Sequence, residues 1–72
     1  MEKVEKYKEF DRVPIPRSIP ELGIEAGAKG TVHDVYDEGR SLFVEVSGED
    51  GIPLGFVDLD LYPEPRVVAY SR

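Results

Sequence analysis

The stretch Ile19-Pro-Glu-Leu-Gly-Ile-Glu-Ala-Gly-Ala-Lys-Gly-Thr-Val32 decides the fold, because it leads through three spaced glycines into a β-branched pair. Glycine allows the chain to turn sharply, whereas β-branched residues favour strands. The stretch is therefore typical of a diverging turn that feeds a strand, and it predicts a small β-barrel. Phosphate-binding glycine loops lead into a helix N-terminus instead, so no cofactor is expected here.

Outward from that turn, short runs of alternating apolar residues predict strands. The expected strands cover residues 11–17, 31–36, 42–46, 54–59 and 65–70, and a tight helical turn is expected over 58–63. Pro14 and Pro16 lack an N–H donor, so the first segment is an edge strand or an extended arm. Five short strands, a long first loop and two hairpins predict an all-β fold, a five-stranded SH3-like barrel over residues 10–72. A short charged extension, with a weak helical pattern, precedes it over residues 1–9.

The chain has 72 residues and no cysteine, which indicates one small domain without disulfide staples. No apolar run is long enough to span a bilayer, and the charged N-terminus does not resemble a signal peptide. We expect a cytoplasmic protein. The apolar end Val67-Val-Ala-Tyr70 could pair with an edge of its own barrel or with another chain, which makes a homodimer a possible assembly.

The net charge of −6 is unevenly distributed. Residues 1–17 carry five basic and four acidic side chains, a net charge of +1, whereas residues 18–72 carry four basic and eleven acidic ones, a net charge of −7. An acidic body repels a phosphate backbone and suits a basic protein partner, so nucleic acid is not the expected partner. The alternative is that the acidic charge only maintains solubility.

Several spaced motifs also carry a family resemblance. The positions concerned are Asp11, Val13, Ile19-Pro-Glu-Leu-Gly23, Ala26-Gly27, Gly30-Thr-Val32, Val35-Tyr36, Phe43-Val-Glu-Val46, Asp50-Gly51 and Leu61-Tyr-Pro63. In these residues the chain resembles a family of short, uncharacterised bacterial proteins with an SH3-like or KOW-like barrel. The resemblance covers roughly residues 10–63 and implies a fold, but no activity. The chain lacks the basic loop of KOW modules and the tryptophan of peptide-binding SH3 domains.

No residue pattern indicates catalysis, a cofactor or a metal site. His33 adjoins Asp34, but neighbouring strand residues point to opposite faces, so a solvent-facing histidine is expected rather than a catalytic pair. No serine or threonine has a histidine and a carboxylate placed near it by the sequence. Asp58 and Asp60 lie two residues apart, but no loop supplies the further oxygen ligands that a hard cation requires.

An exposed aromatic residue with acidic neighbours is the candidate binding feature. Phe43 lies on the strand face opposite Leu42, Val44 and Val46, with Tyr36 or Val57 expected close by. Such a patch could bind protein. Two alternatives stay open: the barrel closes over Phe43, or the N-terminal segment packs Val4 and Tyr7 on it. The candidate protein-binding residues are Asp34, Tyr36, Asp37, Glu38, Phe43 and Glu45.

Two functions are compatible with these observations. The first is a non-catalytic interaction module that binds a basic protein, for example as an antitoxin-like or accessory subunit. The second is a KOW-like nucleic-acid-associated module, which requires that its cations gather on one face: Arg12, Arg17, Lys29 and Arg66.

Overall fold

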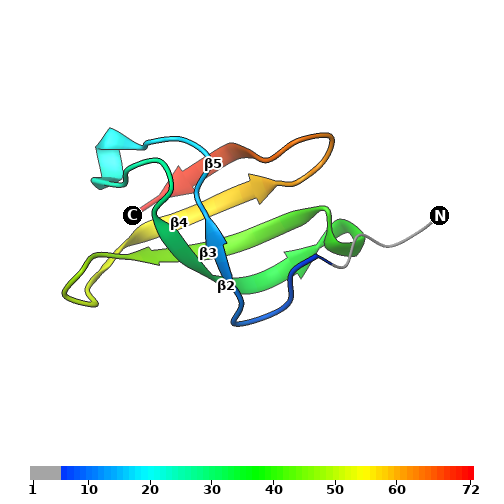
Figure 1. The fold of residues 1–72 in the computed structure, drawn as a ribbon, viewed down its shortest axis with the longest axis horizontal. Coiled ribbons are helices and arrows are strands. Elements are labelled where there is room, and N and C mark those ends of the chain that lie inside the picture. The colour runs from blue at the N-terminus through cyan, green and yellow to red at the C-terminus, as the bar shows by residue number, and fades with distance from the viewer. Residues whose placement is uncertain (1–5) are drawn as a thin grey trace.

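Five antiparallel strands form a single sheet in the computed structural model, which describes residues 6–72 (Figure 1). The strands are β1 (Arg12–Pro14), β2 (Lys29–Tyr36), β3 (Ser41–Ser47), β4 (Pro53–Asp60) and β5 (Arg66–Ser71). Each strand pairs with the next one in the sequence, so the order across the sheet is β1-β2-β3-β4-β5. The predicted all-β fold with five strands is confirmed.

The apolar alternation of the central strands builds the core. In β3, Leu42, Val44 and Val46 are fully buried, while the residues between them are only partly buried. Because side chains alternate across a strand, this pattern turns one face of the sheet toward the core. Each fully buried aliphatic side chain stabilises the fold by roughly 1.5–3 kcal/mol. The other buried apolar residues are Val13, Ile15, Ile19, Leu22, Ile24, Val32, Val57 and Leu59.

The first loop folds back on itself before it enters β2. The Ile19 and Ile24 backbones form an isolated bridge, with the Ile19 N–H donating to the Ile24 carbonyl at 2.7 Å. Between them lies a single 3-10 turn, η1 (Pro20–Leu22), which ends at Gly23 with a left-handed φ of 72°. A glycine adopts that conformation without steric cost. The predicted turn that feeds a strand is therefore present.

The two edges of the sheet, β1 and β5, are not paired with each other in the described part of the chain. The Ile15 N–H donates to the Ala28 carbonyl at 2.8 Å and the Ile15 carbonyl accepts from Gly27 at 2.8 Å, so Ile15 faces β2. Pro14 and Pro16 therefore hold the alternate positions, whose backbone faces away from β2. An edge without N–H groups at these positions is a poor partner for another strand. Closure into a barrel is not found, and the SH3-like assignment stays a prediction.

Side chains, rather than backbone pairing, link the first loop to the end of β5. The Arg72 Nη2 donates to the Glu21 carbonyl at 2.7 Å, and the Arg17 guanidinium lies 6.0 Å from the Tyr70 ring centroid. The backbone N–H of Glu21, and then the Tyr70 hydroxyl, lower the pKa of the Glu21 carboxyl group. The Glu21 carboxylate is also the main reason why the pKa of Tyr70 is raised.

Two local predictions from the sequence differ from the structure. The helical turn predicted over residues 58–63 is wrong, because β4 continues to Asp60 and pairs there with Ser41. Leu59 is nevertheless buried and Leu61 packs partly on the core. Of the predicted N-terminal helical turn, residues 1–5 lie outside the described part of the chain, and residues 6–10 form no helix.

Candidate functional site

The face of the sheet that points away from the core carries a regular pattern of rings and carboxylates, and we call it the outer face. Across β3 and β4, Phe43 pairs with Asp58 and Glu45 pairs with Phe56. The two phenylalanines thus lie on one diagonal, where their rings stack with centroids 5.2 Å apart and planes 1° from parallel. The two carboxylates lie on the other diagonal. Such ring pairs contribute roughly 0.5–1.5 kcal/mol beyond the area that they bury.

A bulge in β2 brings His33 to this ring pair. The register between β2 and β3 shifts between Val32 and Asp34, so His33 is the extra residue. Its ring meets Phe43 and Phe56 edge-on, with centroids 6.3 Å and 5.8 Å away. His33 Nε2 lies 3.0 Å from Glu45 Oε1. The predicted solvent-facing histidine is confirmed, and its carboxylate partner is Glu45 rather than the adjacent Asp34.

Tyr36 continues the aromatic diagonal onto β2. It pairs with Ser41, one row beyond the pair formed by Asp34 and Phe43, so Phe56, Phe43 and Tyr36 cross three neighbouring strands in a line. Tyr36 is 46% exposed. Partial removal from water, and then the negative charges of Asp34 and Asp58, raise the pKa of Tyr36. Both carboxylates therefore lie close enough to act on its hydroxyl.

The four carboxylates of the outer face differ in their partners. Glu45 has His33, and Asp60 accepts a hydrogen bond from the Ser41 hydroxyl at 2.8 Å. Asp60 Oδ2 also lies 3.9 Å from the Arg66 guanidinium. Asp34 and Asp58, which flank Phe43 on its two sides, have no hydrogen bond or ion pair with any residue from 6 to 72. They are the acidic groups available to an added cation.

The predicted binding residues divide into two groups. Asp34, Tyr36, Phe43 and Glu45 lie together on the outer face. Asp37 and Glu38 lie instead beyond the end of β2, in the 3-10 turn η2 (Asp37–Gly39). Both adopt positive φ angles, of 50° and 56° respectively. They extend the acidic region at one end of the sheet rather than bordering the rings.

Of the two residues expected near Phe43, Tyr36 shares the outer face with it, whereas Val57 does not. Val57 is fully buried, and its neighbours Phe56 and Asp58 occupy the outer face. The alternation Gly55-Phe-Val-Asp-Leu59 carried this signal, because period two places Phe56 and Asp58 on one face and Val57 on the other. The stacked ring pair could have been found from the hairpin register.

Neither of the alternatives that would cover Phe43 is found in the described part of the chain. Phe43 lies outside the core cluster, on the opposite face of the sheet from Val44. Tyr7 packs against the core, not on the ring pair. Val4 lies outside the described residues.

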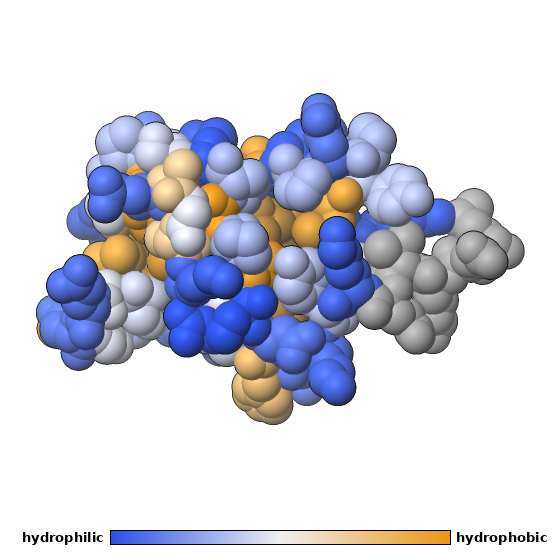
Figure 2. Space-filling view, viewed as in Figure 1, coloured by the Kyte–Doolittle hydropathy of each residue, from blue (hydrophilic) through white to orange (hydrophobic). Residues whose placement is uncertain are grey.

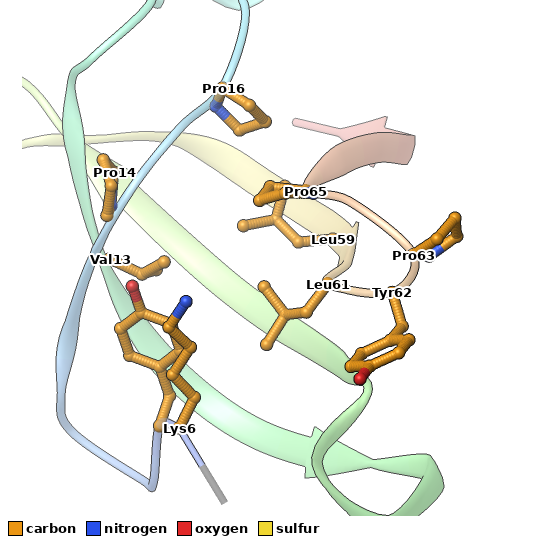
Figure 3. Close-up of a pocket in the computed structure, with 10 residues that line it drawn as sticks. Lys6, Val13, Pro14, Pro16, Leu59, Leu61, Tyr62, Pro63 and Pro65 are labelled. Atoms are coloured by element: carbon orange, nitrogen blue, oxygen red, sulfur yellow. The ribbon is translucent and has the colours of Figure 1, made fainter. Parts of the chain in front are cut away.

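A second feature is an apolar groove between the β1 segment and the end of β4 with its connection to β5, and its cavity volume is about 400 Å³. Figure 3 shows β1 on one side of it and the β4–β5 connection on the other, with Leu59 and Leu61 pointing into the space between. In the space-filling view, hydrophobic atoms are visible between hydrophilic ones on this side of the molecule (Figure 2). The lining residues are Lys6, Tyr7, Val13, Pro14, Pro16, Leu59, Leu61, Tyr62, Pro63 and Pro65.

Neither feature has the groups that a metal centre needs. Residues 6–72 contain no cluster of three or more histidine, cysteine or carboxylate side chains that could hold a metal ion. The pair Asp58 and Asp60 shares the outer face, but Asp60 is engaged by Ser41 and Arg66. Within the same residues, no helix has the length and apolar character needed to cross a membrane.

The cations considered for nucleic-acid binding are spread over the molecule. Arg12 and Lys29 lie at the β1–β2 edge, where they pair with Thr31 and Pro14. Arg17 lies by the Tyr70 ring, and Arg66 lies on β5 at the other edge of the sheet, beside Asp60. The strands between these two edges carry the carboxylates of the outer face.

The fold and this face define a small all-β protein whose outer face combines half-buried Phe43 and Phe56 with exposed Tyr36 and a border of carboxylates. No known family model matches the chain, and no significant match was found among curated protein sequences or solved structures.

Proposed function

We propose that this protein is a non-catalytic interaction module that binds a basic protein partner through its outer face. The observation that carries the proposal is the aromatic diagonal of Tyr36, Phe43 and Phe56, which is bordered by carboxylates. Aromatic side chains are enriched where proteins bind one another, because a ring offers a large contact area at little cost in conformational entropy. The acidic border selects partners of opposite charge.

Charge supports a protein partner over nucleic acid. From Asp34 on β2 across to β4, the outer face carries Asp34, Glu45, Asp58 and Asp60. Among the described residues, the cations on this face lie at its margins: Arg66 beside Asp60 at one edge, and Arg12 and Lys29 at the β1–β2 edge. Nucleic-acid binding releases counterions only where several cations meet the phosphates. An accessory or antitoxin-like role, in which an acidic subunit covers a basic surface, fits this distribution.

The finer fold assignment belongs to the same proposal. The consecutive antiparallel strands and the long first loop with its 3-10 turn support an SH3-like small barrel that is open at the seam between β1 and β5. A relationship to the bacterial family that the chain resembles would place the protein in the cytoplasm. Small barrels serve many functions, so the fold itself adds nothing to the choice of partner.

Comparative capture with matched variants tests the proposal. The wild-type protein, the double variant Phe43→Ala with Glu45→Lys, and the control Glu49→Lys are immobilised and exposed to a lysate of the source cells at about 50 mM salt. Retained proteins are identified, purified and titrated individually by calorimetry. We expect a basic protein that binds the wild type and Glu49→Lys, and binds the double variant at least about tenfold more weakly.

Two outcomes would contradict the proposal. The first is a retained protein that binds the double variant as tightly as the wild type, because the outer face then makes no contribution. The second is retention of nucleic acid in place of protein, with a binding constant that falls steeply with salt; this outcome would favour the KOW-like function.

A further inference from the structure

We infer that the outer face recognises an arginine side chain of the partner, stacked on Phe43 between the carboxylates of Asp34 and Asp58. This inference rests on the proposed function and specifies the group that is bound. It starts from the two carboxylates that have no hydrogen bond or ion pair within residues 6–72.

The strand register places these two carboxylates on opposite sides of one ring. Asp34 on β2 pairs with Phe43 on β3, and Phe43 pairs with Asp58 on β4. Neighbouring strands lie about 4.8 Å apart, so the two aspartates are separated by roughly 9.6 Å at the backbone, with the phenyl ring between them. A cation seated on Phe43 would therefore have one carboxylate on each side.

Phe56 stacks on one face of the Phe43 ring, with a centroid distance of 5.2 Å, and His33 meets it edge-on, so a cation would stack on the other face of the ring. Tyr36 follows along the same diagonal, but within residues 6–72 no ring contact joins it to Phe43. Partial removal from water, and then the negative charges of Asp34 and Asp58, raise the pKa of Tyr36, the ring that follows Phe43 on this diagonal.

The geometry favours a guanidinium over an ammonium. A guanidinium is planar, stacks on aromatic faces, and spreads its five N–H donors around its edge, so it can bond to carboxylates on two sides of a ring at once. A lysine ammonium concentrates its donors at one atom and retains its water more strongly. His33 and Arg66 do not occupy the position between Asp34 and Asp58, because they lie beside Glu45 and Asp60 respectively.

Peptide titrations followed by two-dimensional amide NMR test the inference. Three short peptides of alternating glycine and serine carry regularly spaced arginine, lysine or citrulline, where citrulline has the shape of arginine without its charge. We expect the arginine peptide to bind about fivefold or more tightly than the lysine peptide, and the citrulline peptide to bind most weakly. The largest shifts are expected at Asp34, Phe43 and Asp58.

Two double variants with the same loss of charge provide the control. Asp34→Asn with Asp58→Asn removes the two carboxylates beside Phe43, whereas Glu49→Gln with Glu64→Gln removes two exposed carboxylates elsewhere. We expect the first to abolish the preference for arginine over lysine and the second to preserve it. Phe43→Leu, which keeps an apolar side chain but removes the ring, is expected to reduce the preference as well. Amide spectra and thermal unfolding establish that each variant is folded.

The outcomes separate this inference from the proposed function. Equal binding of the arginine and lysine peptides, with shifts on the outer face, would overturn the arginine inference and leave the basic-partner proposal intact. Equal effects of the two double variants would also overturn the inference. If no basic peptide shifts any outer-face amide, the inference and the proposed function both fail.

Discussion

Gly30 on β2 pairs with Val46 on β3. A Cβ atom at this position would lie 2.3 Å from Val44 Cγ1 and 3.2 Å from the Glu45 carbonyl oxygen. Val44 is fully buried and cannot move aside without disturbing the core. Glycine is needed at this residue for its small size, because its φ angle is not in the left-handed region.

We expect Gly30→Ala to destabilise the protein by about 1–3 kcal/mol, because an added methyl group must displace well-packed neighbours. Chemical denaturation measures the change. Gly48→Ala is the control, since a Cβ there would approach nothing closer than the Asp50 carboxylate at 3.2 Å. Equal stability of Gly30→Ala and the wild type would show that Val44 and Glu45 can make room for the added methyl group.

Glu38 adopts a left-handed conformation, with φ of 56° and ψ of 35°. A side chain in this region costs roughly 1–2 kcal/mol, whereas glycine loses about 0.5–1 kcal/mol more conformational entropy on folding. We therefore expect Glu38→Gly to raise stability by about 0.5 kcal/mol, measured as a shift of the denaturation midpoint. The matched change Glu49→Gly, at a residue without a positive φ, is expected to lower stability. Destabilisation by Glu38→Gly would mean that the Glu38 side chain makes a compensating interaction.

One side of β1 remains unpaired because prolines occupy the positions whose backbone faces away from β2. Proline at residues 14 and 16 removes the N–H groups that a further strand would need. β5 carries no proline between Arg66 and Ser71, so the two edges differ in their capacity to accept a strand.

Pro14→Val combined with Pro16→Val restores these donors, and we expect the variant to self-associate through its first edge. Light scattering should show an average mass that rises with protein concentration, whereas the wild type and the control Pro65→Val should not show that rise to the same extent. A variant that keeps the mass of the wild type would indicate that the prolines do not protect this edge.

Where β1 and β5 leave the seam open, the Glu21 carboxylate of η1 and the Tyr70 hydroxyl of β5 each shift the pKa of the other. The lowered pKa of Glu21 means that its contribution to stability is present above its unfolded pKa and is lost as the pH falls through the folded value. The raised pKa of Tyr70 has the opposite effect on the pH dependence. Its contribution to stability is present below the usual tyrosine pKa of about 10, and it is lost as the pH rises through the pKa of Tyr70 in the folded protein.

We expect Tyr70→Phe to lower the melting temperature near neutral pH and to flatten its dependence on pH in both the acidic and the alkaline ranges. Glu21→Gln should remove the same two contributions. Melting curves across the pH range provide the measurement, with Tyr62→Phe, which removes an exposed hydroxyl from the β4–β5 connection, as the control. Identical pH profiles for Tyr70→Phe and Tyr62→Phe would contradict a coupling between the Tyr70 hydroxyl and Glu21.

The strands could be predicted from the sequence because their evidence is local. The alternation in Leu42-Phe-Val-Glu-Val46 specifies both a strand and its buried face, and the structure confirms both. The end of β4 could not be predicted in this way, because pairing of Asp60 with Ser41 overrides the local preference for a turn. The bulge at His33 was also missed, since a one-residue shift depends on the neighbouring strand.

The candidate face was predicted in part for the same reason. Asp34, Tyr36, Phe43 and Glu45 are near one another in sequence, and the hairpin brings them together. The contribution of Phe56 depends on the register between β3 and β4, which a single strand does not reveal.

At the scale of the whole molecule, the net charge of −6 means that the excess carboxylates repel one another. Salt screens repulsion between exposed carboxylates that are more than about 10 Å apart at 0.1 M, and more than about 3 Å apart at 1 M. We expect the midpoint of thermal unfolding to rise when salt is added, while binding of a basic partner weakens. Opposite responses to the same salt series, measured by melting curves and calorimetry, check this prediction; a partner affinity that is independent of salt would contradict it.

The consecutive strand order also has a consequence for how the chain folds. Every strand pairs with its neighbour in sequence, so each of the three later hairpins closes a short loop, and only the β1–β2 connection spans a long one. Loop closure costs more entropy as the loop lengthens, and chains with local contacts fold faster than chains that must join distant segments. The transition state for folding should therefore contain β2, β3 and β4, with β1 and the first loop added afterwards. In kinetic terms, Val44→Ala should slow folding, whereas Val13→Ala should mainly speed unfolding.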